Sequence, residues 1–145
     1  MGIDEKLDIS DLVLSVGHFQ DSLARTLEIE QMEINGLEPF IPFEMARSAV
    51  IQNYNTAVEA CWKMMQRWIR INADNMIHQK PKRELFRTAH QCGLIDDPAQ
   101  WWGFYEGRNR VAHTYFEPVA VEVWQLAKNF DTAAPEFLKR LEQRL

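Results

Sequence analysis

One long stretch, residues 43–72, most constrains what this chain can fold into. Its apolar residues follow one another at intervals of three or four, the spacing that places side chains on one face of an α-helix. This face contains Phe43, Ala46, Val50, Tyr54, Ala57, Cys61, Met65 and Trp68. Pro42 precedes it, and a proline suits a helix start because its missing N–H needs no partner there. Val58, Trp62 and Ile69 widen the apolar face, which predicts burial against more than one neighbouring helix.

The preceding segment, residues 8–34, also repeats apolar side chains near helical spacing, with charged residues between them. Asp8, Ser10 or Asp11 is placed to cap the first turn of this helix. Asn35-Gly36 and two prolines follow it closely. A second long helix is therefore predicted, joined to the first by a short connection.

After the long stretch, residues 75–81 break the pattern and predict a loop or a frayed helix end. A short helix over residues 82–92 comes next, and Gly93 is suited to cap its C-terminus. The window around this break is net positive in an acidic protein and holds His78, Lys80, Lys82, Arg83, Arg87 and His90. Two interpretations stay open: a solvated helix face, or the electrostatic half of an RNA or nucleotide-phosphate site.

Asp96-Asp97 followed by Pro98 predicts the start of a fourth helix, since aspartate caps helices and proline fits the first helical position. This helix carries a run of large aromatic residues: Trp101, Trp102, Phe104 and Tyr105. At such spacing, core packing is the more common use of aromatic side chains. Trp102 or Tyr105 would stack on a nucleic-acid base if it were exposed.

Glu117-Pro118 interrupts the helical pattern, and residues 119–145 then predict a last long helix. Pro135 lies inside this helix and is expected to kink or split it. Residues 1–145 thus predict a single all-α domain, an antiparallel bundle of four to five helices with short connections. Large aromatic residues on broad helical faces also predict a dimer, because one bundle of this size would struggle to bury them all.

The net charge of −5 gives the chain no general attraction for nucleic acid, so a phosphate-binding surface has to be local. Cys61 and Cys92 have no CxxC spacing and are typical of reduced, buried thiols. Neither a signal peptide nor an apolar run near the roughly 20 residues of a membrane span is recognisable, which predicts a cytoplasmic protein. The four histidines lack metal-ligand spacing and no phosphate-binding loop occurs, so neither a metal site nor a cofactor is expected.

The string Arg108-Asn109-Arg110-Val111-Ala112-His113-Thr114-Tyr115 gathers several chemically useful side chains where a helical pattern should end. The planar guanidinium of Arg108 suits phosphate, and His113 exchanges a proton near neutral pH, its unperturbed pKa being about 6.5. Such a group can do acid–base chemistry on a phosphate without a metal. Residues five apart lie on different faces of a continuous helix. If the helix loosens after Arg110, both side chains can point into one cleft beside the second copy in a dimer. Taken alone, an arginine and a histidine five residues apart are more often surface residues.

The pattern Arg-Asn-x-x-Ala-His-x-Tyr over residues 108–115, in a small all-α chain, resembles the HEPN superfamily. It resembles more closely the HepT-like group, also called nucleotidyltransferase substrate-binding proteins. Further stretches support the resemblance, which runs in order over roughly residues 12–141: residues 50–52, 59–63, 83–87 and 93–97. The chain departs from the family pattern at Asn55, where a glutamate would be expected.

The resemblance implies a dimer whose two motifs face each other, and a minimal nucleotidyltransferase partner with which the chain forms a toxin–antitoxin pair. In HEPN ribonucleases the motif is a metal-independent active site. On this chain, His113 would be the general acid or base for the 2′-hydroxyl and the leaving oxygen. Arg108 would stabilise the pentavalent phosphate, and Asn109 would orient it. Tyr115 matches the tyrosine to which the partner adds AMP, which would silence the site.

Three functions stay open at this point. The first is a metal-independent endoribonuclease toxin, neutralised by its nucleotidyltransferase partner. The second is a non-catalytic nucleotide- or substrate-binding subunit of the same partner. In both, RNA or nucleotide phosphate would be bound by the basic residues Lys80, Lys82, Arg83, Arg87 and Arg110. The third is a structural dimerisation bundle, which leaves the clustered residues of the motif unexplained.

Overall fold

The computed structural model describes residues 7–113 and 116–145, with the backbone alone at Ala112 and His113. Every regular element within these ranges is a helix. They are α1 (Ser10–Ile34), α2 (Phe43–Asn72), the short 3₁₀ helix η1 (Ile77–Gln79), α3 (Lys82–Gln91), α4 (Pro98–His113) and α5 (Glu117–Glu142). The all-α prediction is confirmed, and η1 lies in the segment predicted as a loop.

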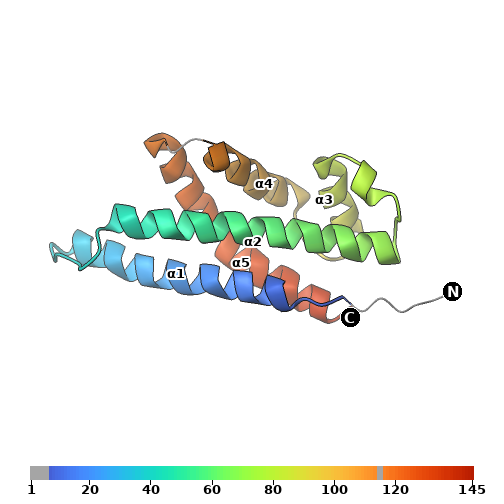
Figure 1. Ribbon diagram of the computed structural model, residues 1–145, viewed down its shortest axis with the longest axis horizontal. Coiled ribbons are helices and arrows are strands. Elements are labelled where there is room, and N and C mark those ends of the chain that lie inside the picture. Colours follow the sequence, from blue (N-terminus) through green and yellow to red (C-terminus); the bar gives the residue numbers. More distant parts are fainter. Residues whose placement is uncertain (1–6, 114–115) are drawn as a thin grey trace.

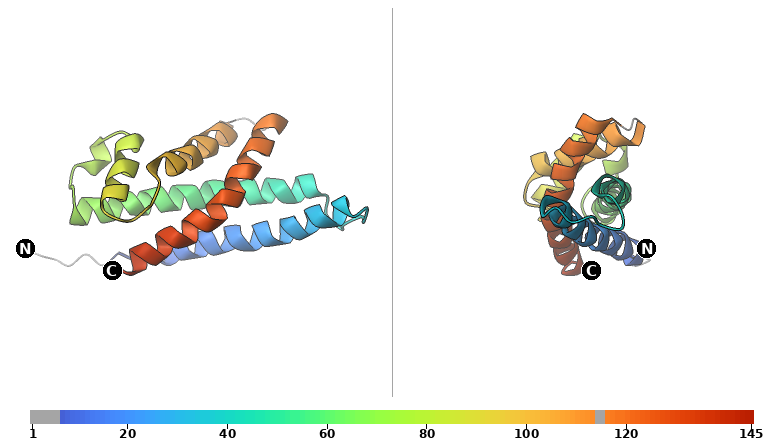
Figure 2. Two further views of the ribbon diagram at one scale, coloured as in Figure 1. Left: turned by 180° about the vertical axis from the view of Figure 1, so that it is seen from behind. Right: turned by 90° about the vertical axis from the view of Figure 1, so that its left-hand side faces the viewer.

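Helix α2 lies at the centre of the arrangement (Figure 1). It packs against α1, η1, α3, α4 and α5. Helix α1 lies along one side of α2, whereas α3 and α4 lie on the other (Figure 1). Helix α5 crosses both α2 and α1 obliquely (Figure 2). The broad apolar face predicted for α2 is explained by this central position.

The core is built around Phe130 of α5. Its ring lies 5.2 Å from the ring of Phe19 on α1, 5.4 Å from Tyr54 on α2 and 5.2 Å from Phe104 on α4, measured between centroids. All four residues are fully buried. The Tyr54 hydroxyl donates to the carbonyl oxygen of Phe104 at 2.7 Å, so the one polar group of this cluster is satisfied. Four helices therefore meet at one aromatic cluster.

The helix ends follow the predicted capping residues. The Asp8 carboxylate accepts from the amide of Ser10 at 2.9 Å. Asp97 accepts from the amides of Ala99 and Gln100, at 3.0 and 3.2 Å. Gly93 has φ of +79°, a left-handed conformation that glycine adopts without steric cost, and it ends α3 as predicted.

The last helix begins two residues earlier than expected, and it is not split. Helix α5 begins at Glu117, with Pro118 in its first turn. A proline fits there because the N–H that it lacks would have no partner within the helix. Pro135 does not split the helix, which runs unbroken from Glu117 to Glu142. Residues on both sides of this proline are buried in the core: Phe130, Ala134, Phe137 and Leu141.

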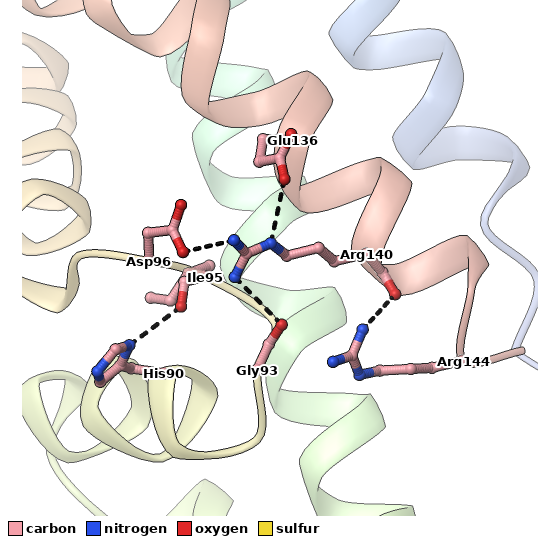
Figure 3. A network of polar contacts seen from close by, with 7 residues as sticks. All are labelled: His90, Gly93, Ile95, Asp96, Glu136, Arg140 and Arg144. Atoms are coloured by element: carbon pink, nitrogen blue, oxygen red, sulfur yellow. Dashed lines mark hydrogen bonds and ion pairs between the residues drawn. The ribbon is translucent and has the colours of Figure 1, made fainter.

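A polar network joins the C-terminal part of α5 to the connection between α3 and α4 (Figure 3). Arg140 pairs with Asp96 and with Glu136, and also donates to the carbonyl oxygen of Gly93 at 3.4 Å. Arg144 donates to the Arg140 carbonyl oxygen at 2.8 Å. Because Asp96 lies two residues before α4, the network holds the start of the helix that carries the motif.

Neither cysteine forms a disulfide; Cys61 is buried, as expected, and Cys92 is half-buried. Burial raises the pKa of the Cys61 thiol. Among the helices in the described ranges, none combines the length and the apolar composition needed to cross a membrane.

We expect Phe130→Ala to lower the free energy of unfolding by about 3–5 kcal/mol, because it opens a cavity where four helices meet. Phe40, in the connection between α1 and α2, is fully exposed. The matched change Phe40→Ala should therefore alter stability by no more than about 0.5 kcal/mol. Urea denaturation of the two variants measures the difference, and similar losses would contradict the placement of Phe130.

Candidate functional site

The motif lies at the C-terminal end of α4, and this helix continues to His113. The helix does not loosen after Arg110, since the backbone stays helical over these residues. The side chain of His113, and the whole of Tyr115, lie outside the described residues.

Arg108 is held by a carboxylate from the neighbouring helix. Its Nη2 donates to Glu59 Oε2 of α2 at 2.6 Å, and its Nη1 donates to Asn109 Oδ1 at 3.3 Å. The side chain is 27% exposed. The structure thus brings together two of the predicted site residues, Arg108 and Asn109, with the guanidinium fixed in one orientation.

Glu59 was not predicted as a site residue. It accepts from Lys63 one turn further along α2 at 2.9 Å, as well as from Arg108. These hydrogen bonds, first from Lys63 and then from Arg108, lower the pKa of the Glu59 carboxyl. Asn55, where the family pattern predicts a glutamate, lies one turn before Glu59 on α2. The carboxylate that meets Arg108 therefore comes from the next turn.

Gly107 allows α4 to approach its neighbours closely beside Arg108. A Cβ at this position would lie 2.6 Å from Leu126 Cδ1 of α5 and 3.3 Å from the Tyr54 hydroxyl of α2. A larger residue would require the Leu126 side chain or this part of α4 to shift. The glycine therefore helps to place Arg108 within reach of Glu59.

A second arginine–glutamate pair holds the other side of the motif. Arg47 Nη2 donates to both carboxylate oxygens of Glu117, each at 2.8 Å. The Arg47 side chain is 5% exposed and that of Glu117 is 55% exposed. Glu117 is the first residue of α5. Helix α2 therefore anchors α4, which carries most of the motif, through Glu59, and it anchors α5 through Arg47. A buried charge on the apolar face of α2 was not predicted.

Two of the predicted binding residues are paired with carboxylates. Lys80 Nζ lies 2.6 Å from Asp74 Oδ2, and Arg110 Nη1 lies 3.1 Å from Glu122 Oε1 on α5. The hydrogen bond with Asp74 raises the pKa of Lys80. The charges of these two cations are therefore partly neutralised by their partners.

Lys82, Arg83 and Arg87 lie on α3, facing aromatic residues of α2 and α4. Lys82 Nζ is 4.1 Å from the centroid of Trp62, and Arg83 Cζ is 4.4 Å from that of Trp102. Both distances are typical of cation–π contacts. Arg87 and Trp102 also line one open hollow between α3 and α4. Arg83 and Arg87 thus share one hollow, whereas Lys82 lies over Trp62 of α2.

The histidines that are described do not converge. His18 and His78 are exposed, and His90 Nδ1 lies 3.1 Å from the carbonyl oxygen of Ile95. In the ranges that the structure covers, no three His, Cys, Asp or Glu side chains are grouped as metal ligands would be.

Comparison with known proteins gives consistent matches over most of the chain. A family model described as "Nucleotidyltransferase substrate binding protein like" matches residues 8–143. A protein of Haemophilus influenzae named "Probable ribonuclease HepT" is 29% identical over 111 residues, which span 74% of this chain and 75% of that protein.

Two solved structures are similar in fold. One, from Haemophilus influenzae, is described as revealing the fold of a substrate binding domain of a nucleotidyltransferase. Its TM-score is 0.81 and its sequence identity is 22%, and the match covers 93% of this chain and 99% of that one. The other, from Thermus thermophilus, has a TM-score of 0.59 at 25% identity, over 85% of this chain and 98% of that one.

We expect Glu117→Ala to lower the free energy of unfolding by about 2–3 kcal/mol, because it takes a carboxylate away from a buried guanidinium. Glu122→Ala removes the exposed partner of Arg110 on the same helix and should cost no more than about 1 kcal/mol. Urea denaturation of both variants makes the comparison. Equal losses would show that the Arg47–Glu117 pair anchors nothing.

The Glu59 carboxylate should make stability depend on pH. Because its folded pKa is lowered, its contribution is complete above the unfolded value of about 4.3 and is lost as the pH falls through the folded pKa. We expect Glu59→Gln to lose less stability than the wild type between pH 7 and pH 3, measured by urea denaturation at each pH. The control is Glu28→Gln on the exposed side of α1, which should behave as the wild type does.

Proposed function

The chain belongs to the nucleotidyltransferase substrate-binding-protein-like family, and from this membership we propose that it is a metal-independent endoribonuclease. In this proposal it is the toxin of a toxin–antitoxin pair, and a minimal nucleotidyltransferase neutralises it. The resemblance to HepT-like proteins is confirmed by the family match and by the related ribonuclease. The observation that carries the ribonuclease proposal is the Arg108 guanidinium, held by Glu59 beside Asn109 in the last turns of α4.

The proposed reaction needs only proton transfer and charge stabilisation. His113 takes the proton from a ribose 2′-hydroxyl, and the 2′-oxygen attacks the adjacent phosphorus. The 5′-oxygen leaves and receives a proton, so the products are a 2′,3′-cyclic phosphate and a 5′-hydroxyl end. In the dimer that we propose, the two motifs face each other, and one His113 serves as base while the other serves as acid.

Arg108 suits the proposed role of stabilising the pentavalent phosphate. A guanidinium has five N–H donors, and Glu59 and Asn109 each accept from one of those on Arg108. The ion pair with Glu59 holds the planar group in place, so little reorganisation is needed when negative charge develops on the phosphate. Asn109, which accepts from Arg108, would keep this orientation and can donate its amide to the phosphate.

The proposed silencing reaction adds AMP to Tyr115. The phenolic oxygen attacks the α-phosphorus of ATP bound by the partner, pyrophosphate leaves, and the phenolic proton passes to a base of the partner. The product carries a bulky nucleotide and a negative phosphodiester two residues after His113. Both features would oppose the entry of RNA phosphate.

A second candidate is a non-catalytic subunit that binds nucleotide or substrate for the same nucleotidyltransferase. The family description and the Haemophilus influenzae domain of the same fold favour it, because both are described by substrate binding. The Arg108–Glu59 pair is compatible with it, since a fixed guanidinium binds phosphate without cutting RNA.

The test is cleavage of single-stranded RNA in the presence of a chelator, by protein produced without the partner and shown by mass spectrometry to be unmodified at Tyr115. We expect cleavage with 2′,3′-cyclic phosphate ends, and a loss of at least about 100-fold in His113→Ala and Arg108→Ala. The matched controls His18→Ala and Arg25→Ala change exposed residues of α1 and should cleave as the wild type does.

Cleavage that survives His113→Ala would overturn the ribonuclease proposal. Absence of cleavage by the unmodified protein, together with nucleotide binding that Arg108→Ala weakens, would establish the second candidate instead. Co-production with the nucleotidyltransferase should add the mass of AMP and abolish cleavage in the wild type, but not in Tyr115→Phe. Silencing of Tyr115→Phe to the same degree would place the modification elsewhere.

A further inference from the structure

We propose that the hollow between α3 and α4 is a second RNA subsite, which binds one unpaired nucleotide of single-stranded RNA at the opposite end of α4 from the cleavage site. The base stacks on the Arg83 guanidinium, and Arg87 binds the phosphate. This inference rests on the proposed ribonuclease function and adds to it the class of RNA and the residues that select it.

The hollow has the size and the lining that such a nucleotide needs. Its volume is about 230 Å³, and it is lined by Arg83, Arg87, Pro98, Ala99 and Trp102. Arg83 stacks on Trp102, with Cζ 4.4 Å from the ring centroid. A planar guanidinium supported by an aromatic ring offers its outer face to a base, a common mode of recognition of unpaired RNA bases.

The two arginines of the hollow are only weakly engaged by carboxylates. In the part of the chain that the structure describes, Arg83 forms no ion pair with an acidic side chain. Arg87 meets Glu84 at 3.5 Å, and its side chain is 66% exposed. Lys80 and Arg110 differ, since both lie in shorter pairs. Positive charge is therefore available at the hollow in a protein whose net charge is −5.

Helix α4 begins at this hollow, and its dipole adds a partial positive charge there. The Asp97 carboxylate already accepts from the amides of Ala99 and Gln100. A phosphate in the hollow would therefore be bound by the guanidinium of Arg87, not by the first amides of the helix.

The hollow is linked to the motif along one ridge of α4. Trp102, Tyr105 and Arg108 follow at intervals of three residues, and such residues form a continuous row on a helix. The rings of Trp102 and Tyr105 lie 5.5 Å apart between centroids, and Tyr105 also contacts Trp62, 6.2 Å away. Trp102 and Arg108 are separated by about 9 Å along the helix axis. Both helices that form the hollow lie on the same side of α2 (Figure 1).

The test is binding of a short labelled RNA, measured by fluorescence anisotropy in the His113→Ala background, with the same sequence as a single strand and as a duplex. We expect the single strand to bind more tightly. Arg83→Ala and Arg87→Ala should each weaken its binding about tenfold, whereas Arg25→Ala, which removes a guanidinium from α1, should change binding less than about twofold.

Two further variants separate stacking from charge. Arg83→Lys keeps the charge without the planar group and should lose most of the affinity that Arg83→Ala loses. Arg87→Ala should reduce the slope of the logarithm of affinity against the logarithm of salt concentration, by the amount expected for about one phosphate contact. Unfolding curves that match the parent show that these changes do not act through the fold.

The outcomes separate failure of the subsite from failure of the ribonuclease proposal. If the wild type cleaves RNA through His113 while Arg83→Ala and Arg87→Ala bind and cleave normally, the subsite is wrong and the ribonuclease proposal stands. If duplex and single strand bind equally, the assignment of single-stranded RNA is wrong. A protein that neither cleaves nor binds RNA overturns both.

Discussion

The structure depends on a single central helix, α2, that both fills the core and places the motif. It contacts every other helix in the described ranges, and two of its charged residues pair with residues of α4 and α5. Glu59 holds Arg108 in α4, and Arg47 holds Glu117 at the start of α5. Arg47 and Glu59 are twelve residues apart, or about 18 Å along the axis. The rigidity of one long helix therefore sets the relative positions of the two helices that flank the motif.

The distribution of charge explains how an acidic protein of this kind can offer a phosphate-binding surface. Lys80 and Arg110 are paired with carboxylates, and Lys82 lies over the Trp62 ring, away from the hollow. Arg83 and Arg87 remain at the hollow beside Trp102. Positive charge is thus concentrated at the hollow between α3 and α4 and at Arg108, instead of being spread over the surface. Phosphate would bind at these places despite the net negative charge of the protein, because the attraction there is local.

Much of the fold was predictable because helical periodicity and capping are local properties. The repeat in residues 43–72 predicted α2 with the bounds that it has, and Asp97 and Gly93 marked helix ends by their own chemistry. The Arg108–Glu59 pair joins residues 49 apart in sequence, and no local pattern reports it. The unbroken course of α5 through Pro135 likewise depends on burial against other helices. The dimer, and the roles of His113 and Tyr115, stay predictions.

The short span between α4 and α5 gives the proposed silencing reaction a direct physical basis. Only three residues separate His113, the last residue of α4, from Glu117, the first of α5. Consecutive Cα atoms are about 3.8 Å apart, so those of His113 and Tyr115 lie at most about 7 Å from each other. A nucleotide attached to Tyr115 therefore stays close to the motif whatever conformation the span adopts. Since α2 anchors the helices on both sides, the proposed switch would need no rearrangement of the bundle: the added phosphodiester would compete with RNA phosphate for the same fixed guanidinium.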